Sequence, residues 1–454
     1  MTMGDVINVD ELIGRQRFGR FALRVVVVAL LALVVEGYDV LVMSFAAPSL
    51  MNTWHLPRGA FGPVLSAALF GIVFGSPLFG WLGDRIGRKK CIVISSAAYG
   101  VFSLLCLLAP NLTVLVMLRF LTGLGLGGVL PNSIATAVEL SPLKLRPTIA
   151  SFIGGGISLG GIVPGLIAAR LGGPDTWKVL LLVGGVAPFL IAALVAVGLP
   201  ESVSFLVQRG ADRRRIARLV REIDPSAPVT ETTRFTVNAA PEDRNAGFKE
   251  LFAGPLAVAT PALWLMYAAS LLTLFMLSNW IPLLLGASGF SPAMAANANV
   301  LFQVGGLVGL VAAGLLLNRL GVKFVTVMFA LTLLAISFTA LAPLGRGPLL
   351  AAIAGCGFFV IGTQCVLNGT AGVIYPTAIR ARGAGMGLGV GRIGSVIGPL
   401  VAGAMVAQGI TSARALFMLP IAPLALGLLA SLLLIGRVSV RDAAGEGAPA
   451  PLKP

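Results

Sequence analysis

Four ionisable residues inside long apolar runs are the strongest candidates for chemistry in this chain. Glu36 and Asp39 lie three positions apart in the first run, so they share one face of a helix. Arg119 lies in the fourth run and Arg392 in the eleventh. A charged side chain near the centre of a bilayer costs about 2.5–3.5 kcal/mol on insertion scales, so each position needs a partner or a function. These residues predict a charge-handling site inside a membrane protein.

The two kinds of charge suggest two tasks. Neighbouring carboxylates in a poorly hydrated cleft can share a proton, so we expect Asp39 and Glu36 to carry protons. Arginine presents a planar fork of donors that matches a carboxylate, so we expect Arg119 and Arg392 to bind an anionic substrate. We expect all four side chains to meet in a central cavity. The alternative is a static cluster of ion pairs that only positions helices.

Polar side chains in the same runs are candidates for the remaining substrate contacts. Tyr38 adjoins Asp39, and the amides of Asn132, Gln364 and Asn368 can bond ring hydroxyl groups. Each amide is also suited to a hydrogen bond between helices, which is the commoner use of such residues in membranes.

Several classes of enzyme and cofactor site are excluded. The chain has one histidine, His55, which excludes a multi-histidine metal centre, and its four cysteines lack paired spacing. Two GxGxxG matches, beginning at Gly123 and Gly389, lie inside apolar runs without a preceding strand, so a dinucleotide site is not expected. We expect no cofactor, no metal and no enzymatic activity. Small residues four apart instead predict close helix packing at Gly123 and Gly127, Gly387 and Gly391, and Gly394 and Gly398.

These residues are positioned by apolar segments that need lipid as their solvent. The chain has 454 residues, of which 57% are hydrophobic and 11% charged. A helix needs about 20 apolar residues to cross the hydrocarbon layer. Twelve such runs are present, at about 22–50, 59–82, 91–110, 112–138, 148–171, 179–199, 257–285, 295–317, 324–343, 348–373, 383–408 and 414–435. They lack period-two alternation, so the sequence predicts an all-α membrane protein and excludes a β-barrel.

The formal net charge of +15 is explained by topology rather than by nucleic-acid binding. Most of the 33 Lys and Arg residues fall on one side of the membrane when both termini are placed in the cytoplasm. We therefore expect a multi-pass protein of the bacterial inner membrane, in contact with anionic lipid and not with nucleic acid.

The pattern divides the chain into five parts. We expect a cytoplasmic tail at 1–21, a six-helix bundle at 22–199, a cytoplasmic linker at 200–256, a second six-helix bundle at 257–436 and a cytoplasmic tail at 437–454. In the linker, Arg214, Arg218 and Arg221 share one helical face, which suits either lipid headgroups or plain solvation.

The two bundles are related by an internal repeat. A shift of 234 residues carries Gly80, Asp84, Arg85, Gly87 and Lys89 onto Gly314, Asn318, Arg319, Gly321 and Lys323. Two halves with the same orientation predict parallel repeats about an axis along the membrane normal, with a substrate site between them near the midplane.

The segment Gly80–Lys89 is similar to the signature loop between helices two and three of the major facilitator superfamily. The resemblance implies twelve helices in two pseudo-symmetric six-helix bundles, with Asp84 and Arg85 in a charge network that holds one access state. The complete predicted gating set is Asp84, Arg85, Arg88, Glu139 and Arg146.

A narrower resemblance, which extends over all twelve helices, is to the aromatic acid:proton symporter family. It is carried by Glu36–Asp39, Ala47–Leu50, Arg119–Gly128 with Pro131–Asn132, Tyr375–Arg380 and Gly391–Gly394. The chain departs from the family at Glu36, where the family usually has Asp. The resemblance implies proton-coupled uptake of benzoate-type or phenylpropanoid acids, with the small aromatic acid, protons and the lipid bilayer as partners and a monomer as the working unit.

Two alternatives remain at this point. One is a proton-driven exporter of drugs or organic anions with the same fold, which the partial glycine–proline motif Gly160–Gly165 favours weakly. The other is a non-transporting membrane receptor, which would not need acids inside the membrane.

Overall fold

The computed structural model describes residues 6–230, 232–238, 248–376 and 379–443. The predicted C-terminal tail from residue 444 onward, and residues 1–5 of the predicted N-terminal tail, lie outside these ranges. Among the described residues, 12 helical segments are long and apolar enough to cross a membrane, which confirms the predicted number of spans. The chain is a multi-pass membrane protein. Its contacts define two compact units, 1–240 with 290–300 and 241–289 with 301–454; the predicted domain boundaries stay a prediction.

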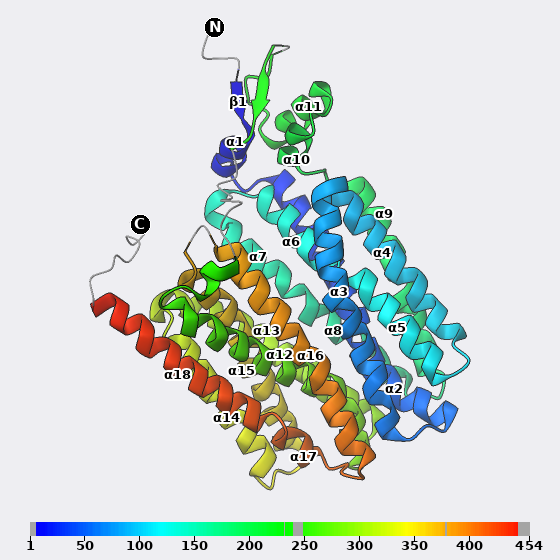
Figure 1. The fold of residues 1–454 in the computed structure, drawn as a ribbon. Coiled ribbons are helices and arrows are strands. Elements are labelled where there is room, and N and C mark those ends of the chain that lie inside the picture. The colour runs from blue at the N-terminus through cyan, green and yellow to red at the C-terminus, as the bar shows by residue number, and fades with distance from the viewer. Residues whose placement is uncertain (1–5, 231, 239–247, 377–378, 444–454) are drawn as a thin grey trace. The chain divides into compact units, whose positions relative to one another are not determined.

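The first unit contains the first six spans, which run from blue to green in Figure 1. Short 3-10 turns accompany them at Arg58–Phe61, Cys106–Leu108 and Leu143–Leu145. The helices are α2 (Arg20–Trp54), α3 (Gly62–Ile86), α4 (Arg88–Leu105), α5 (Leu112–Leu126) with α6 (Val129–Glu139), α7 (Arg146–Gly154) with α8 (Gly156–Leu171), and α9 (Thr176–Gly198).

Two spans of this unit are interrupted, although the sequence predicts them as continuous. The fourth span turns at Gly127 and Gly128, between α5 and α6, and the fifth breaks at Gly155. Close packing requires glycine at the first break, because a Cβ on Gly127 would lie 2.5 Å from the Ser76 backbone nitrogen on α3. Only glycine permits this approach.

The second unit contains a 3-10 turn at Phe248–Phe252 and the remaining spans, apart from residues 290–300, which include the first turns of the eighth span and belong to the first unit by their contacts. Its helices are α12 (Leu256–Ala287), α13 (Pro292–Leu320), α14 (Phe324–Leu341), α15 (Arg346–Ile374), α16 (Arg380–Ala407), and α17 (Ala413–Met418) with α18 (Ile421–Ala443).

Equivalent helices pack in the same way in the two units. The first helix of each unit packs against the fifth and sixth spans: α2 contacts α8 and α9, and α12 contacts α16 and α18. The third span packs on the sixth in both, as α4 on α9 and α14 on α18. The turn after the second span uses a glycine with positive φ in both, Gly87 at 102° and Gly321 at 66°. The predicted pseudo-symmetric pair of six-helix bundles is confirmed.

The predicted small-residue faces are contact surfaces between helices. A Cβ on Gly123 of α5 would overlap the Ala68 carbonyl oxygen on α3, and one on Gly394 of α16 would overlap the Ala268 carbonyl oxygen on α12. Backbones in these pairs touch directly, and any larger side chain must push the helices apart.

The linker contains structure that the sequence analysis did not predict. Strand β1 (Val6–Asn8) pairs in parallel with β2 (Arg234–Thr236), and helix α1 (Val9–Arg15) follows β1. The Asp10 carboxylate accepts hydrogen bonds of 2.8 Å from the Ser204 hydroxyl and from the Asn238 backbone N–H. The N-terminal segment is therefore bound to the linker.

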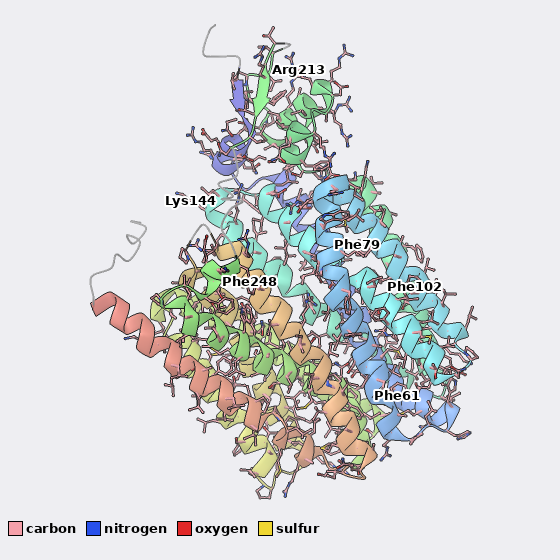
Figure 2. The ribbon with its side chains drawn as sticks, in the orientation of Figure 1. Phe61, Phe79, Phe102, Lys144, Arg213 and Phe248 are labelled. Carbon is pink, nitrogen blue, oxygen red and sulfur yellow. The ribbon has the colours of Figure 1, made fainter. Side chains whose placement is uncertain are left out.

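Two short helices, α10 (Val203–Gln208) and α11 (Arg213–Ile223), form the first part of the linker. Apolar residues of α11 are buried at Ile216, Val220 and Ile223. Its arginines, including the predicted face of Arg214, Arg218 and Arg221, are exposed. In Figure 2, Arg213 and Lys144 lie toward one end of the first unit, and Phe61 lies at the opposite end.

Candidate functional site

A buried ion pair joins Asp39 in the middle of α2 to Arg119 on α5. One guanidinium nitrogen of Arg119 lies 2.6 Å from Asp39 Oδ1, and the other terminal nitrogen donates to the Asp39 backbone oxygen at 2.9 Å. The Ser103 hydroxyl on α4 donates to Asp39 Oδ2 at 2.8 Å. The side chains of Asp39 and Arg119 are 0% and 1% exposed. Three helices thus converge on one carboxylate, and the two buried charges compensate each other.

The Arg119 guanidinium can donate a further hydrogen bond. Its Nε is buried and has no hydrogen-bond partner among the described residues. A guanidinium carries five N–H donors in a fixed plane, so it can bind a second acceptor or exchange one carboxylate for another. Ser103 was not predicted, although its place in an apolar run was a signal of the same kind as the amides.

Glu36 and Tyr38 precede Asp39 on the same helix, α2. Glu36 is buried, with 2% of its surface exposed. The Tyr38 hydroxyl donates to the Leu180 backbone oxygen on α9 at 2.9 Å, which ties α2 to α9. Close by on α9, Gly184 faces Asp39, because a Cβ there would lie 3.5 Å from Asp39 Oδ2. The predicted role of Tyr38 in substrate binding stays a prediction, and its observed contact is between helices.

Asn132 on α6 also makes contacts between helices. Its amide nitrogen donates to the carbonyl oxygens of Gly128 at 2.8 Å and Phe79 at 3.2 Å, and it lies 3.3 Å from the Cys91 sulfur. These bonds join α6 to α3 and α4. They correspond to the interhelical alternative that the sequence analysis left open.

The two predicted amides of the second unit lie together on α15. The Gln364 Nε2 donates to Asn368 Oδ1 at 3.4 Å. Two α12 residues complete the row: Ser270 donates to Gln364 Oε1 at 2.9 Å, and Tyr267 donates to Asn368 Oδ1 at 3.0 Å. Asn368 is exposed and Gln364 is half-buried. The result is a polar row between two helices.

Arg392 lies on α16 of the second unit and is half-buried. Because Asp39 and Arg119 belong to the first unit, the expectation that all four ionisable residues share one cavity stays a prediction.

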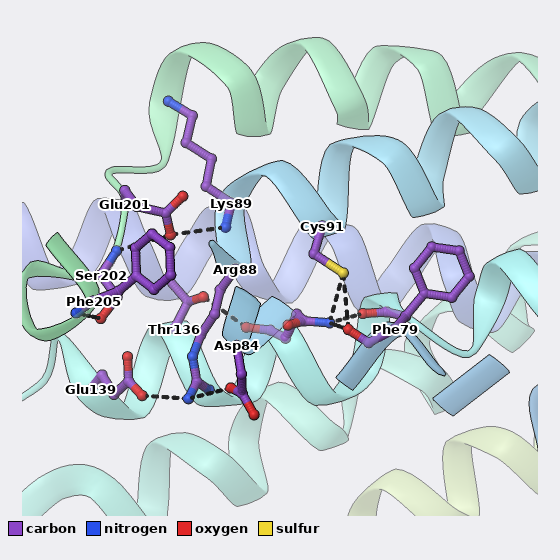
Figure 3. A network of polar contacts seen from close by, with 12 residues as sticks. Phe79, Asp84, Arg88, Lys89, Cys91, Thr136, Glu139, Glu201, Ser202 and Phe205 are labelled. Carbon is purple, nitrogen blue, oxygen red and sulfur yellow. Dashed lines mark hydrogen bonds and ion pairs between the residues drawn. The ribbon is translucent and has the colours of Figure 1, made fainter. Parts of the chain in front are cut away.

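Four of the five predicted gating residues come together at one end of the first unit. Figure 3 shows Arg88 between two carboxylates: its guanidinium lies 2.8 Å from Glu139 Oε1 and 3.5 Å from Asp84 Oδ1. The side chain of Asp84 is 73% exposed and that of Glu139 is 31% exposed. Arg146 donates to the Ser141 backbone oxygen at 3.2 Å and to that of Glu139 at 3.5 Å. The network joins the ends of α3 and α6 to the starts of α4 and α7.

The fifth gating residue, Arg85, points to a different partner. Its guanidinium lies 4.1 Å from the centre of the Trp81 ring, and its backbone oxygen accepts from Arg209 of the linker at 2.5 Å.

A buried carboxylate beside the gate was missed by the sequence analysis. Glu201 accepts from the backbone N–H groups of Lys89 at 3.2 Å and Ser202 at 3.1 Å, as Figure 3 shows for Lys89. It thereby caps the start of α4, where Gly87 provides no side chain and the helix dipole favours a negative charge. An acid directly after the sixth span was the available signal.

Comparison with known proteins identifies the protein family and its fold. The model of the Major Facilitator Superfamily matches residues 29–386. The chain belongs to this superfamily. A gallate transporter of Pseudomonas putida is 35% identical over 405 residues, covering 89% of this chain and 90% of that protein. The 4-hydroxybenzoate transporter PcaK of the same species is 35% identical over 402 residues, covering 87% and 89%.

Solved structures of the superfamily share the architecture. A partially occluded inward-open structure of the Escherichia coli xylose transporter XylE matches with a TM-score of 0.68 at 18% identity, covering 92% of this chain and 98% of that chain. As a member of the superfamily, the protein is a membrane transporter and not an enzyme. The expected kinship with aromatic acid transporters is confirmed by the two Pseudomonas relatives.

Proposed function

We propose that the protein imports small aromatic carboxylates together with protons across the bacterial inner membrane. In this proposal it works as a monomer with both termini in the cytoplasm. The observation that carries it is the buried Asp39–Arg119 pair, a proton-accepting group bonded directly to an anion-binding group. The names of the relatives support the substrate class, because gallate and 4-hydroxybenzoate are both ring carboxylates that carry hydroxyl groups.

The ion pair offers a simple route to coupling. Asp39 holds Arg119 as long as its carboxylate is charged, and protonation of Asp39 removes that charge. A substrate carboxylate then replaces Asp39 at the guanidinium, with which it can form two parallel hydrogen bonds. Proton and anion therefore favour each other's binding, which is the linkage that symport requires. Since Arg119 is buried, the exchange takes place within the rocking motion of alternating access.

The polar row of the second unit suits the rest of the substrate. We assign Gln364 and Asn368 to the ring substituents, because amides both donate to and accept from hydroxyl groups. Arg392 provides a second cation for the carboxylate. The contacts of Tyr38 and Asn132 favour helix packing for these two residues.

The charge network around Arg88 serves as the gate in this proposal. Its ion pairs and hydrogen bonds link four helix ends, and these contacts must break for those ends to separate. Asp84, Arg88, Glu139 and Arg146 hold one access state, while Arg85 ties the same loop to the linker.

Transport by the purified protein in liposomes tests the proposal. With an alkaline interior and no other gradient, we expect labelled benzoate, 4-hydroxybenzoate or gallate to accumulate, and hexanoate, an aliphatic acid, to accumulate less. Dissipation of the pH gradient by a protonophore should abolish accumulation. Failure to accumulate any aromatic acid, or extrusion of a cationic drug by the same vesicles, would contradict the assignment.

A further inference from the structure

Three hydroxyl groups on α4 are buried without partners. Ser95, Ser96 and Tyr99 each have 0% of their surface exposed. None of their side-chain oxygens has a hydrogen-bond partner among the described residues. Buried polar groups in membrane proteins are almost always paired, because the hydrocarbon region supplies no alternative partner. Three such groups within five residues therefore form a cluster of buried hydroxyls that still have hydrogen bonds to make.

Several other buried hydroxyls are paired within their own helix. Thr122, Thr273 and Thr370 each donate to the carbonyl oxygen four residues earlier in their own helix, in every case at 2.8 Å. This bond is the usual way in which a membrane helix satisfies a hydroxyl. Unpartnered buried hydroxyls also occur outside α4, at Ser76, Ser133, Ser141 and Thr326, so what distinguishes α4 among the described residues is the occurrence of three within five residues.

The unpartnered hydroxyls begin beside the candidate coupling site. Tyr99 lies one helical turn from Ser103, which is bonded to Asp39. Ser96 lies three residues before Tyr99, on the same face of α4.

The row continues toward the start of α4. Ser95 lies one turn beyond Tyr99, packed against the backbone of Gly128. Cys91 follows one turn later, and Arg88 of the gate network is at the first turn of the helix. Residues three or four apart share a helix face, so one face of α4 carries polar groups from the Asp39 carboxylate to the gate.

We propose that Tyr99, Ser96 and Ser95 hold a short chain of water molecules that conducts protons between Asp39 and the Arg88 end of α4. This inference rests on the proposed proton coupling. The O–H bond of protonated Asp39 breaks and its proton passes to the adjacent hydroxyl or water. Each oxygen in the chain accepts one proton and releases another, so that every hydroxyl is regenerated. One proton leaves at the Arg88 end, and Asp39 remains as the carboxylate that pairs with Arg119.

A purely structural role for Tyr99 is the alternative. Its Cβ lies 2.9 Å from the position that a Cβ on Gly125 would occupy, so the ring contributes to the contact between α4 and α5. Tyr99→Phe retains this ring and removes only the hydroxyl. Ser96→Ala removes the neighbouring hydroxyl, and it tests the proposal independently if the tyrosine variant fails to fold.

Two transport assays in liposomes distinguish a role of these hydroxyls in proton transfer from a role in helix packing. Net uptake driven by a pH gradient needs a proton to move through the protein, whereas counterflow of labelled against unlabelled 4-hydroxybenzoate needs no net proton movement. We expect Tyr99→Phe combined with Ser96→Ala to slow net uptake at least 10-fold and to change counterflow less than twofold. Ser431→Ala is the matched control, because this buried serine donates to the Leu428 carbonyl in its own helix at 2.7 Å.

The outcomes also distinguish this inference from the proposed function. If net uptake in the double variant equals that of the wild type while Asp39→Asn abolishes it, the relay is refuted and the coupling role of Asp39 stands. An equal loss of net uptake and counterflow assigns the hydroxyls to packing and refutes the relay as well. Accumulation that survives in Asp39→Asn refutes the proposed coupling itself.

Discussion

Replacement of Asp39 by Asn tests the central ion pair most directly. The amide is nearly the same size as the carboxylate, and Arg119 keeps its 2.9 Å hydrogen bond to the backbone oxygen of residue 39. The 2.6 Å ion pair is lost, which leaves a guanidinium that is 1% exposed without its counter-charge. Removal of one partner of a buried pair costs about 3–5 kcal/mol. We therefore expect Asp39→Asn to lower the free energy of unfolding by about that amount, measured by thermal unfolding in detergent.

Transport by the same variant should lose its driving force. A pH difference of one unit supplies about 1.4 kcal/mol per proton, which supports roughly tenfold accumulation for each proton carried. Asparagine cannot release a proton, so we expect the accumulation ratio in liposomes to fall to about 1 while counterflow continues. The measurement is the internal concentration of labelled 4-hydroxybenzoate at steady state.

A double variant separates stability from coupling. Asp39→Asn with Arg119→Gln removes both charges, so it should regain much of the stability that the single variant loses. It should not regain accumulation, because the proton-accepting group is still absent. Several-fold accumulation by Asp39→Asn under a pH gradient alone would refute the reasoning and make Glu36 the next candidate for the proton carrier.

Three further predictions concern the anion site, the gate and the helix contacts. Arg119→Lys should weaken equilibrium binding of 4-hydroxybenzoate about 5- to 150-fold, or about 1–3 kcal/mol, because lysine lacks the planar fork; wild-type affinity by calorimetry would contradict this. Glu139→Gln should slow uptake more than Asp84→Asn, because the ion pair of Glu139 with Arg88 is shorter and less exposed than that of Asp84. The equilibrium affinity for substrate should stay within about 1 kcal/mol of the wild-type value in both variants. Gly123→Ala should lower the unfolding free energy by about 1–3 kcal/mol in thermal unfolding, whereas Gly355→Ala, where a Cβ meets nothing within 4 Å, should not; equal stability of the two variants would argue against the close contact.

Much of the architecture follows from the sequence alone. The number of spans and the duplication are properties of composition and order along the chain, because the thickness of the hydrocarbon layer sets the length of every apolar run. The candidate charges are visible for the same reason. An ion inside such a run is costly wherever its helix packs, so Asp39 and Arg119 are conspicuous without knowledge of any contact.

The partners of these charges were decided by the tertiary structure. Which residue faces Asp39 depends on how each helix is rotated about its axis, and this rotation is set by contacts such as that of Gly123 with Ala68. For this reason Ser103 was not predicted as a ligand of Asp39, and Glu201 was not predicted as the cap of α4. The pairing of β1 with β2 joins segments more than 200 residues apart, so no local pattern indicates it. Composition and hydropathy act along the chain, whereas hydrogen bonds and ion pairs require two side chains to meet in space, and only the packed helices determine which ones do.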